Sequence, residues 1–346
     1  MSIDQQTPVL PSTPSRPAPL PRAAGGIGIL LAALAMMLGA MVPAQASTAT
    51  APHQVGVRLS PLDLDDEDTI QTLVVTVTNS SREAMTDTTV ALSGPAGWSK
   101  APAERTVKKP IAAGDTVVRN FQVRVPTMRS GFRMHPFSAT VSYTGGDGHG
   151  SVVQDKVMTT GTPVASLKKA YNNVGATTLA TRDKGDFDGD GNSFSAEQLG
   201  KAGVVPGATI EAAGAEFTWP DVKASAKDNA TASGQAISLS GSGSRLAFLT
   251  SGAGLNATGT ATVFYTDGTT STGTVAVPNW TGAGANPDAE VAAAVTGRNT
   301  PDGYGNQNGT YSLYAITIPL DQGKQIETVV LPGNAAIHVF DMQVVD

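Results

Sequence analysis

The 346-residue sequence contains no cysteine, and aromatic and charged residues make up only 5% and 15% of it. The lack of cysteine excludes disulfides, thiolate metal sites and a lipid anchor on cysteine. Exported bacterial proteins often lack disulfides, whereas a small secreted eukaryotic domain usually carries them. Because aromatic residues are scarce, most of them are expected to pack in a core. The composition is therefore that of an exported bacterial protein with few stacking surfaces for sugars.

The sequence has one long apolar run, from Gly25 to Met41, and Arg16 and Arg22 precede it. The small-residue segment Val42–Ala46 follows and ends in Ala-x-Ala. This order is typical of a cleaved signal peptide. The run is shorter than the roughly 20 apolar residues that span a bilayer, which favours cleavage over a membrane anchor. We expect residues 1–46 to be a signal peptide and the mature protein to be secreted, with no membrane contact.

The expected mature chain is acidic. Removing two Arg and one Asp with the signal peptide leaves 21 basic against 28 acidic residues, a net charge of −7. This balance argues against nucleic acid as a partner. The remaining length exceeds that of a typical single domain, so two domains are expected. The abundance of small and β-branched residues favours strands joined by tight turns.

Residues 55–158 contain short runs in which apolar and polar residues alternate. In residues 137–143 every second residue is apolar, and the residues between them carry hydroxyl groups. Such alternation predicts a strand with one buried face. Similar runs occur at 73–77 and 117–125, separated by turn signals at 94–97 and 112–115. The region is predicted to be a β-sandwich of roughly 100 residues.

Several motifs follow one another in this region: Val-x-Val-x-Asn ending at Asn79, Gly-Pro-x-Gly-Trp ending at Trp98, Ala-Gly-Asp ending at Asp115 and Val-x-Val-Pro ending at Pro126. An Ala-x-Val-x-Tyr strand ends at Tyr143. This order resembles the NPCBM-associated immunoglobulin-like domain of bacterial alpha-galactosidases. The resemblance implies a spacer or accessory domain without an active site.

The second region, from Leu167 onward, is also rich in strand patterns. Asp267-Gly268 lies between two alternating runs and predicts a two-residue hairpin. A second hairpin is expected around Gly214, and Ser195–Ala202 is predicted to be the only short helix of this region. The number of strands, without the crossovers that parallel sheets need, predicts a jelly-roll-like β-sandwich.

Four motifs in this region occur in order: Tyr-Asn-Asn-Val-Gly from Tyr171, Phe-Asp-Gly with Ser-x-Ser-Ala-Glu up to Glu197, Phe-Thr-Trp-Pro up to Pro220, and Thr-Asp-Gly-Thr from Thr266. Together they resemble an accessory β domain appended to secreted actinobacterial glycosidases. The resemblance implies a sugar-binding accessory module. The expected all-β organisation is a signal peptide (1–46), a flexible lead-in (47–54), an immunoglobulin-like accessory domain (55–158), a linker (159–166) and a jelly-roll-like carbohydrate-binding domain (167–346).

Residues 186–197 match the calcium-loop pattern Asp-x-Asp-x-Asp-Gly-x5-Glu. The pattern predicts calcium as a cofactor, with these ligands: Asp186, Asp188, Asp190, the backbone carbonyl of Asn192, and a bidentate Glu197. Ser193 occupies a position that is normally aliphatic, and the preceding segment lacks the apolar period of a helix. The alternative is an Asp-Gly turn with additional acids beside it.

Sugar binding usually requires an exposed aromatic ring. Of the three tryptophans, Trp98 and Trp219 are expected to pack in the cores, whereas Trp280 lies in a predicted loop and is the best candidate for exposure. Tyr304, in a Gly- and Asn-rich segment, is the second candidate. We therefore predict Trp280 and Tyr304 as carbohydrate-binding residues.

The sequence contains no recognisable catalytic set. The four histidines show no repeated spacing, and no Gly-x-Ser-x-Gly motif is present. Our leading hypothesis is a secreted, non-catalytic accessory protein that binds carbohydrate or polysaccharide, or assists a glycosidase. One alternative is a sandwich-type glycoside hydrolase or lyase that uses paired carboxylates in the second domain, since their separation is spatial. The other is a structural envelope protein without a ligand.

Overall fold

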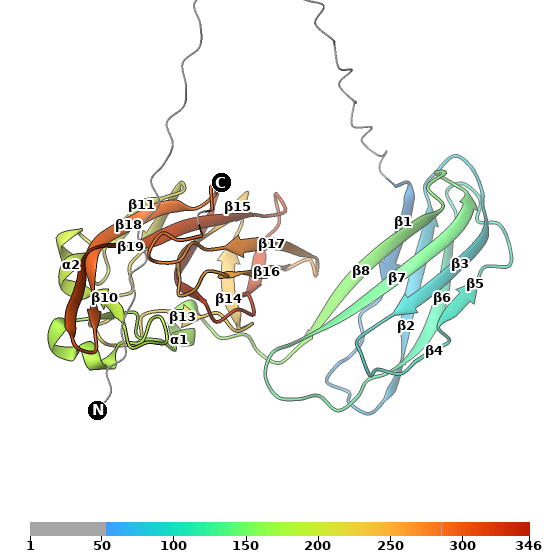
Figure 1. Ribbon diagram of the computed structural model, residues 1–346. Helices are drawn as coiled ribbons and strands as arrows, with labels where there is room; N and C mark the ends of the chain where they lie inside the picture. The colour runs from blue at the N-terminus through green and yellow to red at the C-terminus, as the bar shows by residue number, and fades with distance from the viewer. Residues whose placement is uncertain (1–52, 285) are drawn as a thin grey trace, which may run out of the picture. The chain divides into compact units, whose positions relative to one another are not determined.

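The computed structural model describes residues 53–284 and 286–346. The predicted signal peptide and residues 47–52 of the predicted lead-in lie outside these residues. Within them, no helix combines the length and the apolar character needed to cross a bilayer. The described chain is built mainly of strands arranged in two β-sandwiches (Figure 1), which confirms the predicted all-β fold.

The first sandwich consists of two antiparallel four-stranded sheets, drawn in blue to green in Figure 1. One sheet has the order β1 (Val55–Leu59), β2 (Ile70–Asn79), β6 (Thr116–Arg124), β4 (Lys100–Ala101). The other has the order β5 (Glu104–Thr106), β3 (Met85–Ser93), β7 (Arg133–Gly145), β8 (Ser151–Thr160).

The predicted alternation forms the core of this sandwich. Along β7 every second residue from His135 to Tyr143 is buried, and Phe121 and Leu73 meet these side chains from the other sheet. The Asn79 of the Val-x-Val-x-Asn motif is fully buried at the end of β2. Its side-chain amide donates to three backbone carbonyls, and its Oδ1 accepts from both the backbone N–H and the hydroxyl of Ser81. This residue therefore ties the loops at one end of the sandwich together.

The second sandwich contains a seven-stranded and a four-stranded sheet. The larger sheet has the order β13 (Ala230–Thr231), β21 (Ile337–Val345), β15 (Arg245–Gly252), β19 (Gly303–Pro319), β18 (Glu290–Thr300), β10 (Ser193–Ser195), β9 (Ala176–Thr177). The smaller sheet has the order β14 (Ala236–Gly241), β20 (Ile326–Val330), β16 (Thr258–Tyr265), β17 (Thr270–Ala276). A separate hairpin joins β11 (Thr209–Ala212) to β12 (Ala215–Thr218).

The central strands of the seven-stranded sheet are buried on both faces. Leu246 and Phe248 of β15 pack toward the smaller sheet, whereas Ala247 and Leu249 pack in a second core with the β11–β12 hairpin and the aromatic residues Phe217 and Trp219. A strand covered on both faces reads as a continuous apolar run, as β15 does. Phe187, Trp280 and Tyr311 of this second core lie beside the candidate site.

Three short helices lie in the second region: α1 (Leu167–Ala170), the 3-10 helix η1 (Leu179–Lys184) and α2 (Ala196–Lys201). The prediction of a single helix was therefore wrong, although α2 was predicted at its correct place. The hairpins expected around Gly214 and Asp267-Gly268 are both present, as β11–β12 and β16–β17. The predicted linker 159–166 overlaps the end of β8, and its Val164 forms a bridge to Ile237.

Candidate functional site

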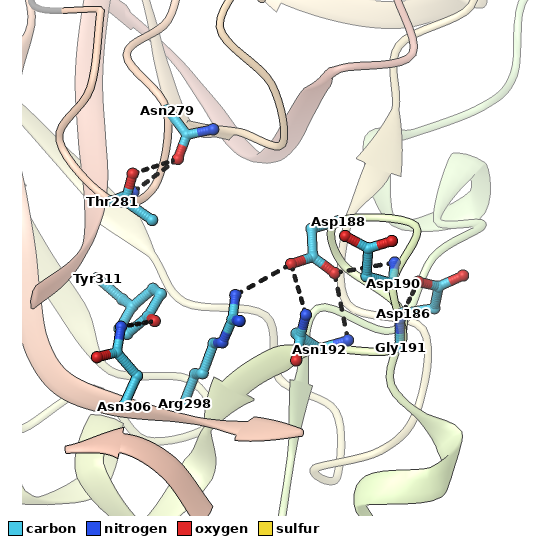
Figure 2. Close-up of polar contacts among 10 residues, drawn as sticks. All are labelled: Asp186, Asp188, Asp190, Gly191, Asn192, Asn279, Thr281, Arg298, Asn306 and Tyr311. Atoms are coloured by element: carbon cyan, nitrogen blue, oxygen red, sulfur yellow. Dashed lines mark hydrogen bonds and ion pairs between the residues drawn. The ribbon is translucent and has the colours of Figure 1, made fainter. Parts of the chain in front are cut away.

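The predicted calcium loop is a turn closed by its own acidic side chains. The Oδ1 of Asp186 accepts from the backbone N–H of Gly191 at 3.0 Å. The Oδ1 of Asp188 accepts from the backbone N–H groups of Asp190 and Asn192, and its Oδ2 accepts from the Asn192 side-chain amide at 2.9 Å (Figure 2). Asp190 is exposed. These bonds stabilise the loop in the way that carboxylates stabilise Asx turns.

The carboxylate of Glu197 accepts hydrogen bonds outside this set. Its Oε1 accepts from the backbone N–H of Leu179 and its Oε2 accepts from the hydroxyl of Ser195, which is the N-cap of α2. In the described part of the chain, the acids of the loop form no group of three with ligand atoms within 4.8 Å of one another. A calcium loop needs its twelfth-position carboxylate on the same ion as the first three acids. The predicted ligand set thus does not fit this arrangement.

Trp280 is buried, with 2% of its surface exposed, so the prediction of an exposed stacking ring was wrong. Its ring packs against Phe187 at 4.8 Å, Phe194 at 5.1 Å and Tyr311 at 4.6 Å between centroids. The loop turns at Asn279, whose Oδ1 accepts from the N–H and the hydroxyl of Thr281. Phe187, inside the predicted calcium loop, is therefore a partner of the tryptophan predicted to bind sugar.

Arg298, on β18, connects these two segments. Its guanidinium lies 5.7 Å from the centroid of the Trp280 ring and 5.6 Å from that of Tyr311. Nη1 donates to Oδ2 of Asp188 at 3.3 Å, and the two side chains are 27% and 10% exposed. Its Nε is buried without a hydrogen-bond acceptor. A cation held on aromatic faces and paired with one carboxylate is positioned firmly.

Polar side chains from three segments are drawn with this arginine in Figure 2. Arg298 lies between Asp188 and Tyr311 in this view, whereas Asn279 and Thr281 lie farther from it. Asn306, which is exposed, donates to the Tyr311 hydroxyl at 2.7 Å. We call this set the Arg298 face: Asp188, Asp190, Asn279, Thr281, Arg298 and Asn306. Arg298 was not predicted as a site residue, because nothing in its local sequence pattern distinguishes it from a surface arginine.

A buried polar chain lies behind Phe187. His338 packs on the Phe187 ring at 4.2 Å, and its Nδ1 shares a hydrogen bond with Oδ1 of Asn229 at 2.7 Å. The Nδ2 of Asn229 donates to Asp228, which also accepts from the backbone N–H groups of Gly175 and Ala176. Through Asp228 and Asn229, these hydrogen bonds connect the start of β9 to His338 on β21.

Burial has opposite effects on the two titratable members of this chain. Burial lowers the pKa of His338 to about 4, although the carboxylates of Asp186 and Asp188 raise it. Burial raises the pKa of Asp228 to about 6, although its hydrogen bonds from Gly175, Asn229 and Ala176 lower it. Both shifts favour the neutral form, as expected for groups taken out of water.

Tyr304 lies on β19, half-buried. Its hydroxyl donates to the backbone carbonyl of Thr296 at 2.7 Å, and its ring covers Gly297. The phenol is thus held on its own hairpin, with part of the ring accessible.

Two acids line one shallow hollow of 320 Å³ in the second sandwich, Asp221 and Asp341. The Oδ2 of Asp341 accepts from the backbone N–H of Thr218 at 2.7 Å and from the side chain of Gln343 at 2.9 Å. The bond from Thr218 joins β12 to β21, which gives Asp341 a structural role.

A comparison with known protein families identifies a domain in the first sandwich. Residues 66–144 match the NPCBM-associated, NEW3 domain of alpha-galactosidase. No curated protein matches the chain. One solved structure, the crystal structure of the periplasmic chaperone SfaE, is 8% identical over 84% of this chain and 100% of that chain, with a TM-score of 0.23.

The second sandwich has its own match. Residues 162–346, which are more than half of the chain and contain the Arg298 face, match the AziU2-like beta-sandwich domain. The chain belongs to the family of the AziU2-like beta-sandwich domain.

Proposed function

We propose that this protein is a secreted, non-catalytic accessory protein that binds carbohydrate through the Arg298 face. Its first sandwich matches a domain of alpha-galactosidase, which supports a role beside a glycosidase. The signal-peptide pattern in residues 1–46 supports export.

The observation that carries the proposal is the convergence of hydrogen-bonding side chains around one fixed cation. Arg298 presents N–H donors, Asp190 presents carboxylate acceptors, and Asn306 presents both kinds of group. Sugar hydroxyls donate and accept at once, so they pair with such mixed sets. Trp280 acts below this surface by holding Arg298 in place, and binding relies on hydrogen bonds rather than on stacking.

The proposal is tested by isothermal calorimetry of the purified chain against a panel of neutral and uronic-acid polysaccharides. We expect Arg298→Met to weaken binding at least tenfold, because an arginine that donates to a ligand contributes a charge-assisted hydrogen bond. Arg245→Met, on β15, is the matched control and should bind as the unchanged protein does. The proposal would be refuted if no polysaccharide of the panel binds, or if Arg298→Met binds as tightly as Arg245→Met.

A second measurement separates this role from the enzyme alternative. We expect no turnover of chromogenic glycosides by the purified protein. Hydrolysis that is lost in Asp221→Asn or Asp341→Asn variants that remain folded would instead favour a glycosidase with paired carboxylates.

A further inference from the structure

Three potential metal ligands meet at one end of the first sandwich. His53 directly precedes β1, and Asp147 and His149 lie in the turn between β7 and β8. One ligand atom from each side chain lies within 4.8 Å of the other two. In the part of the chain that the structure describes, this is the one such group of three. It lies in a different sandwich from the Arg298 face, so it is independent of the proposed function.

The turn is shaped to bring its two ligands to one side. Its sequence is Gly145-Gly146-Asp147-Gly148-His149-Gly150, and all four glycines have φ between +63° and +78°. Glycine adopts these angles without the steric penalty of a side chain. The tight turn places the His149 ring against that of His53, with 4.4 Å between their centroids.

Asp147 is held in place before any ion binds. Only 4% of its side chain is exposed. Its Oδ1 accepts from the Tyr143 hydroxyl at 2.5 Å and from the His149 backbone N–H, and its Oδ2 accepts from the Gln54 backbone N–H at 2.9 Å. The bonds from Tyr143 and Gln54 come from outside the ligand set and orient the carboxylate, as in protein metal sites.

The spacing of the ligand atoms fits a single ion. Nδ1 of His53 lies 3.5 Å from Oδ2 of Asp147. Two ligands at about 2.1 Å from a tetrahedral ion are about 3.4 Å apart. Two imidazoles and one carboxylate are a donor set that suits late first-row divalent ions and leaves a coordination position open. We propose that His53, Asp147 and His149 bind one divalent transition-metal ion of the Zn²⁺, Ni²⁺ or Cu²⁺ class.

The test is to titrate the untagged full chain with Zn²⁺, Ni²⁺ and Cu²⁺. Calorimetry measures the binding of each ion, and visible absorption also measures that of Cu²⁺. We expect one ion per chain and a rise in the melting temperature on binding. His149→Ala and Asp147→Asn should each weaken binding at least tenfold. Tyr143→Phe keeps the ring but removes the hydrogen bond to Asp147, and should weaken binding about tenfold.

Matched controls are Asp155→Asn, an exposed acid on β8, and His135→Gln, a histidine of the same sandwich outside the group. Both should bind metal as the unchanged protein does. If Asp147→Asn fails to fold, the His149→Ala variant decides, because His149 lies in the turn. The proposal is overturned if none of the three ions binds at one equivalent, or if His149→Ala binds as tightly as the unchanged protein.

Discussion

The guanidinium of Arg298 donates from Nη1 to Oδ2 of Asp188 across 3.3 Å, and this contact joins β18 to the loop before β10. Arg298→Met should lower the free energy of unfolding by about 2 kcal/mol, because a hydrogen bond between charged groups is lost and Asp188 stays largely buried. Urea denaturation measures this. Arg245→Met, whose partner is the backbone carbonyl of Asp346, should change stability less. An Arg298→Met variant as stable as the unchanged protein would show that the ion pair does not stabilise the fold.

Trp280 is a core residue, and its removal should affect the whole second sandwich. We expect Trp280→Ala to lower the free energy of unfolding by about 3–5 kcal/mol, since a large aromatic side chain leaves a cavity against Phe187 and Tyr311. Trp280→Phe should lower it less. Thermal and urea unfolding of the two variants measure this. A stable, fully folded Trp280→Ala protein that had lost only its sugar affinity would contradict the buried position.

His338 makes stability depend on pH. Its pKa falls from the ordinary 6.5 to about 4 in the folded protein, so the unfolded chain takes up the proton first as the pH drops. The stability that neutral His338 contributes is present above pH 6.5 and is lost as the pH falls toward 4, by up to about 3 kcal/mol. Asp228 acts in the opposite direction, because its pKa is raised to about 6: stability is gained as the pH falls below 6.

The two effects offset each other in the unchanged protein. His338→Gln removes the effect of the histidine and leaves that of Asp228. The free energy of unfolding of the variant, compared with that of the unchanged protein at the same pH, should therefore be higher at pH 4.5 than at pH 7. Urea denaturation of both proteins at the two pH values measures this gain. A difference in stability that stays constant with pH would show that His338 does not titrate as described.

The hydrogen bonds of Glu197 lead to a prediction about calcium binding. Because its two oxygens already accept from Leu179 and Ser195, we expect calcium to leave the melting temperature unchanged. Calorimetric titration with calcium, repeated on Asp190→Asn, measures this directly. A rise in melting temperature that disappears in Asp190→Asn would show that the loop rearranges to bind the ion, as the sequence pattern predicts.

Much of the fold could be predicted from local patterns. Alternation at residues 137–143 identified the buried face of β7, and Asp267-Gly268 identified the β16–β17 hairpin, because both depend on the geometry of neighbouring residues. The Asn79 motif was recognised by resemblance, and the five hydrogen bonds of this buried side chain explain why an asparagine stands there.

The candidate sites depended on contacts between distant segments. A loop position suggested that Trp280 is exposed, but Phe187, Phe194 and Tyr311 cover it from three other segments. Likewise, no local sequence pattern predicted that Arg298 belongs to a site or that His53 lies beside His149.

The sequence alone determined the strands, the tight turns and the class of fold, because alternation and glycine-containing turns act over a few neighbouring residues. Which side chains of the loops are buried, and which polar groups of distant segments meet, depends on the tertiary structure. Burial depends on what the other sheets and loops place over a residue, and His53 reaches Asp147 only because the start of β1 lies beside the turn that joins β7 to β8.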